Sequence, residues 1–336
     1  MCSSDLTYGM PGDNPRVCFG SLRDDLARRD FSINAIALVL DPGTPPAEAL
    51  AASGLAPDIP TPTKADIDAL PILDPHGGLA DLRRRNLRLL HGQSLRDDPT
   101  RILRAARYAA RLDFALDPAS LAQWRRTLAA WPWPWRPGDP PALAPPALGT
   151  RLRMELELLL DREPRDLALA ALQAWGALAL LDPGLQADAT WRRRLHWCGR
   201  FGLPPLAALL AGAEDPLALA ERLQIPHRLH RLLAQGLRLR QRLREAGACS
   251  PQAGAWAPSR WCGLLEAPGV CPDAVALLLG LGFRPRRPLL RWLLRWRHIR
   301  SATTAAALLA AGVPAGPRLG ERLRELRQQR LDDAEG

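Results

Sequence analysis

DDPTRILRAARY, residues 97–108, is where the sequence changes from a mixed pattern to a helical one. Asp98 is suited to cap a helix and Pro99 to occupy its first position, so we predict a helix from there to about Leu112. At 3.6 residues per turn, its arginines fall within about a third of the circumference and its apolar residues lie opposite. These arginines are Arg101, Arg104, Arg107 and Arg111.

The arginine face of this helix has two interpretations. Like charges on one helix face repel each other by a few tenths of a kcal/mol per pair, so something must offset them. Scattered acidic partners on a solvated face would do so, and so would bound phosphates, with an Asp–Arg pair reading a base edge. The spacing alone leaves both interpretations open.

Away from this helix, the pattern predicts an α+β protein. Before it we expect a short helix over 24–29, strands at Ile33–Leu40 and Leu87–Leu90, and a long loop over 41–72. After it, the proline-rich segment 131–146 predicts a rigid connector. The remaining helices are predicted at 119–130, 148–160, 165–180, 190–201, 216–223, 227–245, 272–281, 288–299 and 318–330.

Composition favours a polyanionic partner. The 336 residues, enough for about two domains, carry a formal charge of +10, and all basic residues except Lys64 are arginines. No uncharged apolar run is long enough for a transmembrane helix, so we expect no membrane partner. The six cysteines form no CxxC pair, and we expect them to be reduced thiols in the cytoplasm.

Three motifs, in this order, resemble the class II tRNA nucleotidyltransferase (CCA-adding enzyme) and bacterial poly(A) polymerase family. They are RRDFSINA (28–35), DPHGGLADL (74–82) and DDPTRILRAAR (97–107). TRLRMEL (150–156) is similar to the neck helix of that family, and GVPAGPRLG (312–320) to its tail signature. The resemblance spans about residues 7–331.

The resemblance implies an RNA 3′-end nucleotidyltransferase that adds CMP and/or AMP from CTP and ATP to tRNA or another RNA 3′ end. Arg28 and Arg29 would hold the triphosphate, Asp30 the ribose hydroxyls, and Asn34 would support them. Asp98 and Arg101 would read the base edge. Arg104 and Arg107 would add phosphate contacts.

The resemblance also implies structural roles and a domain order. Its hinge or flexible loop would contain Asp74, Gly77, Gly78 and Asp81, and its neck would be supported by Arg151, Arg153 and Glu155. Residues 7–93 would be the remnant of a nucleotidyltransferase head, with an incomplete small antiparallel sheet and helices. Residues 94–160 would be an all-helical neck, and residues 161–336 an RNA-binding body and tail.

The catalytic carboxylates of the resembling family have no counterpart in this chain. That family holds Mg²⁺ on an Asp-x-Asp pair that precedes the RRD motif, and Asp5, Asp13, Asp24 and Asp25 do not reproduce it. We therefore expect an N-terminally truncated chain, with Met1–Leu6 not native, that binds nucleotides weakly and is inactive alone. We assign no catalytic residue and no metal ligand.

Two alternatives remain open. The arginine-rich helices after residue 148 predict RNA binding by themselves, so the chain could be a non-catalytic RNA-binding helical module. It could also be one half of a split enzyme that a second polypeptide completes.

Overall fold

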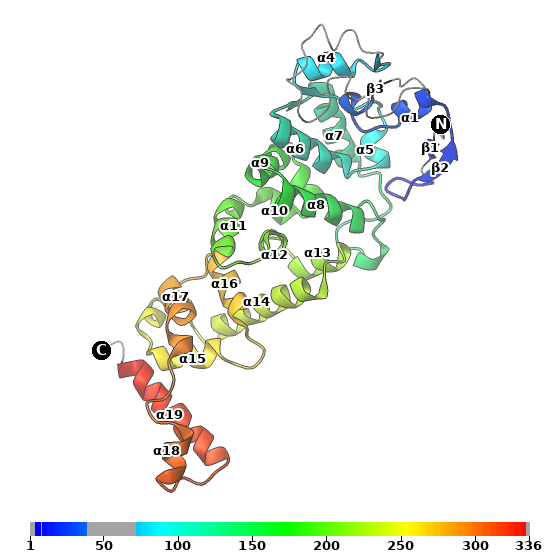
Figure 1. Cartoon of the computed structure of the whole chain (residues 1–336). Coiled ribbons are helices and arrows are strands. Elements are labelled where there is room, and N and C mark those ends of the chain that lie inside the picture. The colour runs from blue at the N-terminus through cyan, green and yellow to red at the C-terminus, as the bar shows by residue number, and fades with distance from the viewer. Residues whose placement is uncertain (1–3, 8, 39–71, 334–336) are drawn as a thin grey trace, which may run out of the picture. The chain divides into compact units, whose positions relative to one another are not determined.

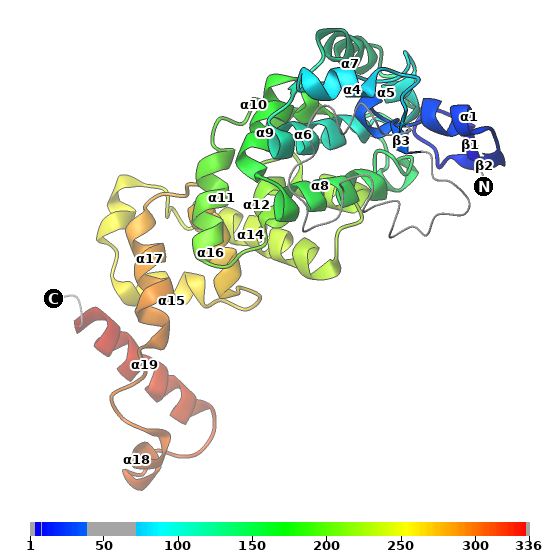
Figure 2. The same ribbon diagram turned by 45° about the horizontal axis from the view of Figure 1, so that its top comes forward.

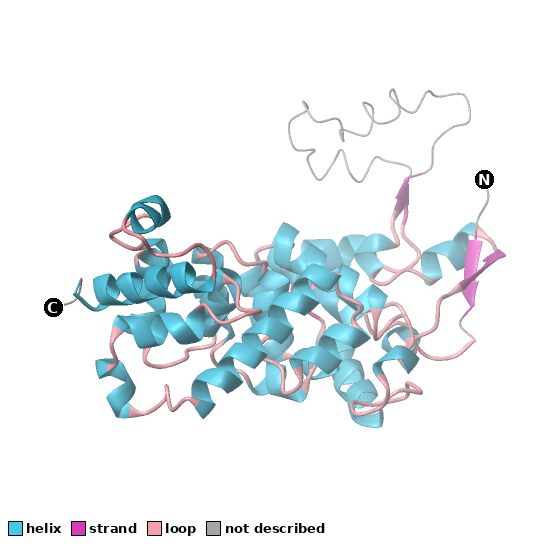
Figure 3. Ribbon diagram, turned by 90° about the horizontal axis from the view of Figure 1, so that it is seen from below, coloured by secondary structure: helices cyan, strands magenta, loops and turns pink. Residues whose placement is uncertain are grey.

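The computed structural model describes residues 4–7, 9–38 and 72–333, and its contacts divide the chain into two compact units. The first unit is Met1–Leu180 and the second is Leu181–Gly336. Within these described residues, strands occur only in the first unit and helices dominate both units, in agreement with the predicted α+β class (Figure 3). The predicted boundaries after residues 93 and 160 stay predictions.

The described residues of the first unit form three two-stranded sheets. β1 (Ser4–Thr7) pairs antiparallel with β2 (Arg16–Phe19), and β3 (Ala37–Leu38) pairs antiparallel with β4 (Ile72–Leu73). β5 (Asn86–Leu87) pairs parallel with β6 (Ala115–Leu116), which the predicted antiparallel sheet did not include.

The strand predicted at Ile33–Leu40 is wrong over its first half. Ser32–Asn34 forms a 3-10 turn, because the buried Ser32 hydroxyl bonds to Asp81 and its N–H donates to the Arg88 carbonyl. The strand predicted at Leu87–Leu90 is shorter, and Leu89 instead bridges Phe31. The loop predicted over 41–72 lies outside the described residues, except for Ile72.

The helices in the described part of the first unit are α1 (Leu22–Ala27), α4 (Gly78–Arg83), α5 (Ser94–Asp97), α6 (Arg101–Leu112), α7 (Pro118–Ala130), α8 (Thr150–Arg162) and α9 (Arg165–Ala174). Of these, periodicity did not reveal the short helices α4 and α5. A 3-10 turn, Ala177–Leu180, follows α9 in place of the helix end predicted there.

The core of the first unit is built around α6. Its apolar side, which includes Ile102, Leu103 and Ala106, is buried, and α6 packs against both α8 and α9 (Figures 1 and 2). Burial of the Ile102 side chain and of the Leu103 side chain each stabilises the unit by about 1.5–3 kcal/mol. The opposite side of α6 therefore carries the arginines.

The connector predicted at 131–146 contains no α-helix, as expected; a 3-10 turn, Pro141–Leu143, lies within it. It is anchored by tryptophans rather than left exposed. Trp133 and Trp135 are buried, and the Trp133 indole N–H donates to the Arg96 carbonyl at 3.0 Å. This anchor fixes the chain between α7 and α8, next to the short helix α5.

The second unit is helical throughout the described residues. Its helices are α10 (Pro183–Ala187), α11 (Trp191–Arg200), α12 (Pro205–Leu210), α13 (Pro216–Arg222), α14 (His227–Glu245), α15 (Pro258–Leu265), α16 (Pro272–Gly280), α17 (Arg286–Leu294), α18 (Ala305–Ala310) and α19 (Pro317–Asp333). α16 is buried from Ala274 to Gly280 and packs against α11, α14 and α17.

The described cysteines Cys198, Cys249, Cys262 and Cys271 are free thiols. Burial raises the pKa of Cys198 to about 11 and that of Cys262 to about 12, so neither forms a reactive thiolate near neutral pH. No helix in the described part of the chain is long and apolar enough to cross a membrane.

Candidate nucleotide site

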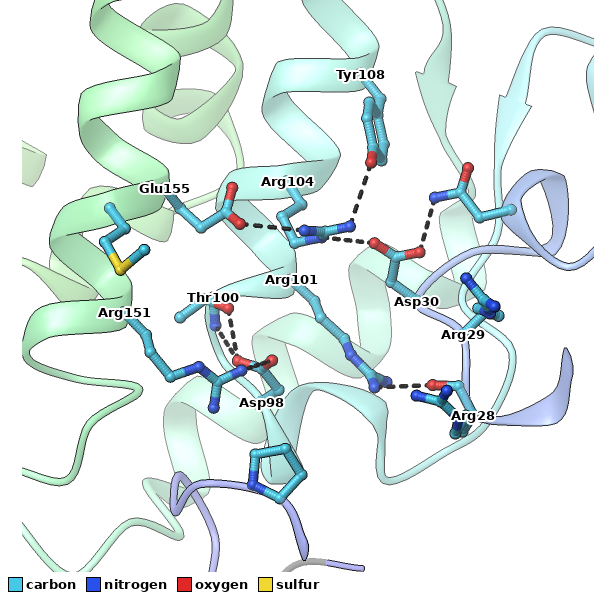
Figure 4. Close-up of a pocket in the computed structure, with 13 residues that line it drawn as sticks. Arg28, Arg29, Asp30, Asp98, Thr100, Arg101, Arg104, Tyr108, Arg151 and Glu155 are labelled. Atoms are coloured by element: carbon cyan, nitrogen blue, oxygen red, sulfur yellow. Dashed lines mark hydrogen bonds and ion pairs between the residues drawn. The ribbon is translucent and has the colours of Figure 1, made fainter. Parts of the chain in front are cut away.

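One cavity in the first unit, of about 550 Å³, collects most of the residues that the motifs single out (Figure 4). Three segments far apart in the sequence contribute to it: the RRD motif, the start of α6 and the exposed side of α8. Its lining residues are Pro15, Arg28, Arg29, Asp30, Asn34, Asp98, Thr100, Arg101, Arg104, Tyr108, Arg151, Met154 and Glu155.

Asp98 is held at the N-terminal end of α6 by groups on two sides. Its Oδ1 accepts from the Thr100 N–H at 3.1 Å and from the Thr100 hydroxyl at 2.6 Å. Its Oδ2 pairs with the Arg151 guanidinium of α8. The helix itself begins at Arg101, two residues after the predicted start, and its N-cap is Thr100, so the predicted capping by Asp98 is wrong. These contacts therefore fix the orientation of the carboxylate.

Arg101 lines the same cavity as Asp98 although the residue is only 6% exposed. Its Nη2 donates to the Arg28 carbonyl at 3.1 Å, and its Nη1 donates to the Ser94 hydroxyl and faces His91 Nε2 at 3.4 Å. The acid at 98 and the guanidinium at 101 thus share one wall of the cavity, as the motif predicts.

Asp30 and Arg104 form the centre of the cavity (Figure 4). Arg104 Nε lies 2.6 Å from Asp30 Oδ2, and Arg104 Nη1 lies 3.1 Å from Glu155 Oε1. Asp30 Oδ1 also accepts from the Asn34 amide at 2.7 Å. Burial opposes the charge on Arg104, but the neighbouring Asp30 and Glu155 outweigh it and raise the pKa of Arg104.

Arg28 and Arg29 lie at the edge of the cavity and share one acidic neighbour. Both guanidiniums pair with Asp25 of α1, Arg29 at 2.7 Å. Burial would raise the pKa of Asp25, but hydrogen bonds from Arg29 and Arg28 lower it below its usual value. Two cations on one anion leave a net positive edge, which suits a polyphosphate.

Arg107 does not belong to the cavity lining, in contrast to its predicted phosphate contact. Its guanidinium pairs with Glu155 of α8 and, at 3.2 Å, with Glu163. Arg111 pairs with the same Glu163. The helix face that looked uniform in sequence is therefore divided: Arg101 and Arg104 face the cavity, whereas Arg107 and Arg111 bind α6 to the end of α8.

Of the three residues predicted to support the neck, two make ion pairs with α6 or with the turn before it. Arg151 holds Asp98, and Glu155 holds both Arg104 and Arg107. Arg153 pairs with Glu157 of its own helix at 3.1 Å and does not line the cavity.

The residues of the DPHGGLADL motif shape α4 and its contact with the 3-10 turn Ser32–Asn34. Asp74 caps α4 by accepting from the Gly78 and Leu79 N–H groups at 2.6 and 2.9 Å. Gly77 has φ +71°, and a Cβ on Gly78 would collide with the Ser32 carbonyl oxygen. Asp81, 4% exposed, accepts from the Ser32 hydroxyl at 2.5 Å. The motif therefore locks α4 against the 3-10 turn that follows the RRD residues, and its hinge role stays a prediction.

A magnesium ion does not fit the carboxylates of this cavity. Asp30 and Asp98 each bond to an arginine and to a further donor, and Glu155 bonds to two arginines. Mg²⁺ binds carboxylate oxygens, and the oxygens of these three side chains are already bonded to cationic arginines. Within the described residues, no three His, Cys, Asp or Glu side chains are grouped for a metal.

The motifs missed several residues of the site. Tyr108 accepts from Arg104 at 3.3 Å, Met154 contributes an apolar side chain to the lining, and Ser94 and His91 contact Arg101. The only sequence signal for His91 and Ser94 is their position in HGQS (91–94), which ends two residues before the DDPTR motif.

No family model matches the chain. A CC-adding tRNA nucleotidyltransferase of Deinococcus radiodurans is 38% identical over 236 residues, which are 68% of this chain and 51% of that protein. This chain thus spans about half the length of that relative.

Solved structures share the fold. One CCA-adding enzyme in an apo form matches with a TM-score of 0.66 at 20% identity, covering 99% of this chain and 72% of that one. The Thermotoga maritima CCA-adding enzyme complexed with tRNA matches with a TM-score of 0.61 at 19% identity, covering 99% and 78%. The motifs, the fold and the identity to a curated relative agree, and the chain belongs to the tRNA nucleotidyltransferase family.

Proposed function

We propose that this chain binds CTP and ATP in the cavity and serves the transfer of CMP and/or AMP to the 3′ end of tRNA. The observation that carries the proposal is that Asp98 and Arg101 line one cavity together with the RRD residues 28–30. The cavity thus combines a base-reading pair with a cationic phosphate edge. The Deinococcus relative, named CC-adding, and the Thermotoga enzyme, solved with tRNA, support tRNA as the RNA.

The Asp98–Arg101 pair suits cytosine and adenine. Both bases carry an exocyclic amine beside an unprotonated ring nitrogen, so a carboxylate accepts from the amine while a guanidinium donates to the ring nitrogen. Uracil and guanine carry a carbonyl beside a ring N–H, which would place oxygen against Asp98. The pair therefore selects CTP and ATP without a nucleic-acid template.

The rest of the nucleotide would lie along the RRD segment. Arg28, Arg29 and Arg104 would bind the triphosphate through charged hydrogen bonds. Asp30 and Asn34, which bond to each other, would accept from and donate to the ribose hydroxyls. Arg107 is left out of the proposed site because it does not line the cavity and its guanidinium pairs with Glu155 and Glu163.

Mg²⁺, which the family resemblance implies, has no ligand set among the described residues, and no step proposed for this chain depends on it. The work of these residues is to bind, select and orient the nucleotide. We place this work in the cytoplasm, where tRNA and nucleoside triphosphates meet.

Equilibrium binding of the four nucleoside triphosphates to the full chain tests the proposal. CTP and ATP should bind at least about tenfold more tightly than UTP and GTP, the value of one good charged hydrogen bond. Asp98→Asn, which adds an N–H donor facing the base, should shift the preference toward UTP.

Asp113→Asn is the matched control, since Asp113 follows the other end of α6 and its side chain is 94% exposed. Equal affinity for all four nucleotides, or no effect of Asp98→Asn on the preference, would reject the proposed function.

A further inference from the structure

The Arg101 guanidinium contacts the backbone of the lining residue Arg28 and the side chains of two residues outside the cavity lining, His91 and Ser94. A guanidinium carries five N–H groups in a fixed plane. One Nη2 N–H goes to the Arg28 carbonyl, and Nη1 donates to Ser94 Oγ and faces His91 Nε2. The Nε–H and the second Nη2 N–H have no partner among the described residues and remain for a ligand. Because the group is planar, these three partners determine the direction of the remaining donors.

His91 is itself held in place by neighbouring elements. The carbonyls of His91 and Gly92 accept from the Gln123 side-chain amide of α7 at 3.2 and 2.8 Å. The Ser94 N–H donates to the same His91 carbonyl at 3.2 Å. Ser94 is fully buried. The loop before α5 is therefore fastened to α7, and it presents an imidazole nitrogen and a hydroxyl to Arg101.

The His91 ring is placed to accept a hydrogen bond rather than to donate one. Arg101 offers only N–H groups, so a contact with His91 is favourable only when Nε2 carries no proton. Burial and the charge of Arg101 lower the pKa of His91, with Asp97 acting in the opposite direction. Burial raises the pKa of that Asp97. Burial and the charge of Arg101 outweigh that of Asp97, so the pKa of His91 lies below its ordinary value of 6.5 and the ring is neutral at neutral pH.

We propose that His91, together with Ser94, is a positioning residue that fixes the Arg101 guanidinium and so sets base selection. This inference rests on the function proposed for the same cavity. A guanidinium held in one plane offers its donors to the ring nitrogen of cytosine or adenine beside Asp98. Freed from His91 and Ser94, it turns about its own side-chain bonds and reaches the carbonyls of uracil as well. Selectivity then falls while phosphate binding stays.

Two substitutions at His91 separate positioning from packing. His91→Gln keeps an acceptor near the position of Nε2, whereas His91→Leu keeps a side chain of similar bulk and removes the acceptor. Ser94→Ala removes only a hydroxyl, so it tests the same idea if His91→Leu fails to fold. His196→Leu, at an exposed histidine of the second unit, is the control.

The experiment measures the dissociation constants of CTP, UTP and inorganic tripolyphosphate with the full chain by calorimetry. We expect His91→Leu and Ser94→Ala to lower the CTP over UTP affinity ratio about tenfold, with tripolyphosphate affinity within about twofold of the parent chain. His91→Gln and His196→Leu should keep the parent ratio. In acid, His91 gains a proton and can no longer accept from Arg101. The CTP over UTP affinity ratio of the parent chain should therefore fall, and that of His91→Gln should fall less.

Three results would overturn the inference. One is an unchanged ratio in both His91→Leu and Ser94→Ala. Another is an equal loss in His91→Gln and His91→Leu. The third is a parallel loss of tripolyphosphate affinity, which would mean general damage to the cavity. A parent chain that does not distinguish CTP from UTP would instead reject the proposed function itself.

Discussion

Arg104 Nε lies 2.6 Å from Asp30 Oδ2, so α6 is joined to the RRD motif across 74 positions of the chain. The Asp30 side chain is 8% exposed and that of Arg104 is 34% exposed, so the pair is open to the cavity on the arginine side. In the proposed site this arginine has two tasks: it neutralises Asp30 and it offers its remaining N–H groups to a phosphate.

Arg104→Met should weaken tripolyphosphate binding about tenfold, because it removes a charged donor from the cavity. Arg107→Met should leave that binding within about twofold, because Arg107 does not line the cavity. Calorimetric titration of both variants makes the comparison. An equal loss of affinity in the two variants would show that the division of the arginine face is wrong.

Arg107→Met should instead lower the free energy of unfolding by about 1–3 kcal/mol, the usual cost of leaving a partly buried charge pair incomplete. Glu155 and Glu163 would each keep one arginine, Arg104 and Arg111, which limits the loss. Urea unfolding followed by circular dichroism measures it. A stability equal to that of the parent chain would mean that the links between α6 and the end of α8 contribute nothing.

Gly78→Ala should destabilise the first unit by about 2 kcal/mol or more, because its Cβ would meet the Ser32 carbonyl and lie 2.8 Å from Ile36 Cγ1. Gly77→Ala should cost about 1 kcal/mol through its positive φ alone. Gly92→Ala is the control, since a Cβ there meets nothing within 4 Å. Thermal unfolding of the three variants tests the ranking, and a Gly78→Ala variant as stable as Gly92→Ala would refute the close packing.

Glu163→Gln should lower stability by about 1–2 kcal/mol at neutral pH. Burial alone would raise the pKa of Glu163, but hydrogen bonds from Arg111 and Arg107 outweigh it and lower the pKa. A carboxyl with a lowered folded pKa contributes stability above its unfolded pKa of 4.5 and loses it as the pH falls through the folded value.

The difference between Glu163→Gln and the parent chain should therefore shrink in urea titrations performed below about pH 4.5. Glu157→Gln serves as the control, because the Glu157 side chain is 33% exposed and, within the described part of the chain, its ion pair is with Arg153 of its own helix. A deficit that is the same at neutral and acid pH would show that the ionised form of Glu163 is not what stabilises the fold.

Long amphipathic helices were the part of the fold that periodicity could predict. α14 occupies His227–Glu245, the range predicted for it, because one side is regularly apolar over five turns. α5, α12 and α18 were missed, since helices of four to six residues are too short to show a period. The apolar run Ile33–Leu40 is typical of a strand, but contacts of Ser32 with distant residues impose a 3-10 turn, Ser32–Asn34, on its start.

Only those site residues that belong to the sequence motifs could be predicted. The motifs located Asp30, Asp98 and Arg101, all of which line the cavity. They could not show that Arg104 faces the cavity and Arg107 does not. The partners of Arg107, Glu155 and Glu163, lie in and at the end of α8, 48 and 56 positions away. Nor could they show His91 behind Arg101, since that contact depends on how α7 fastens the loop before α5.

A crystal structure of the chain grown with CTP tests the central claim most directly. The account predicts the cytosine amine within hydrogen-bond distance of the Asp98 carboxylate, the Arg101 guanidinium on the ring nitrogen or carbonyl, and the triphosphate along Arg28, Arg29 and Arg104. A cytosine bound away from Asp98 and Arg101, or a triphosphate outside this cavity, would contradict it.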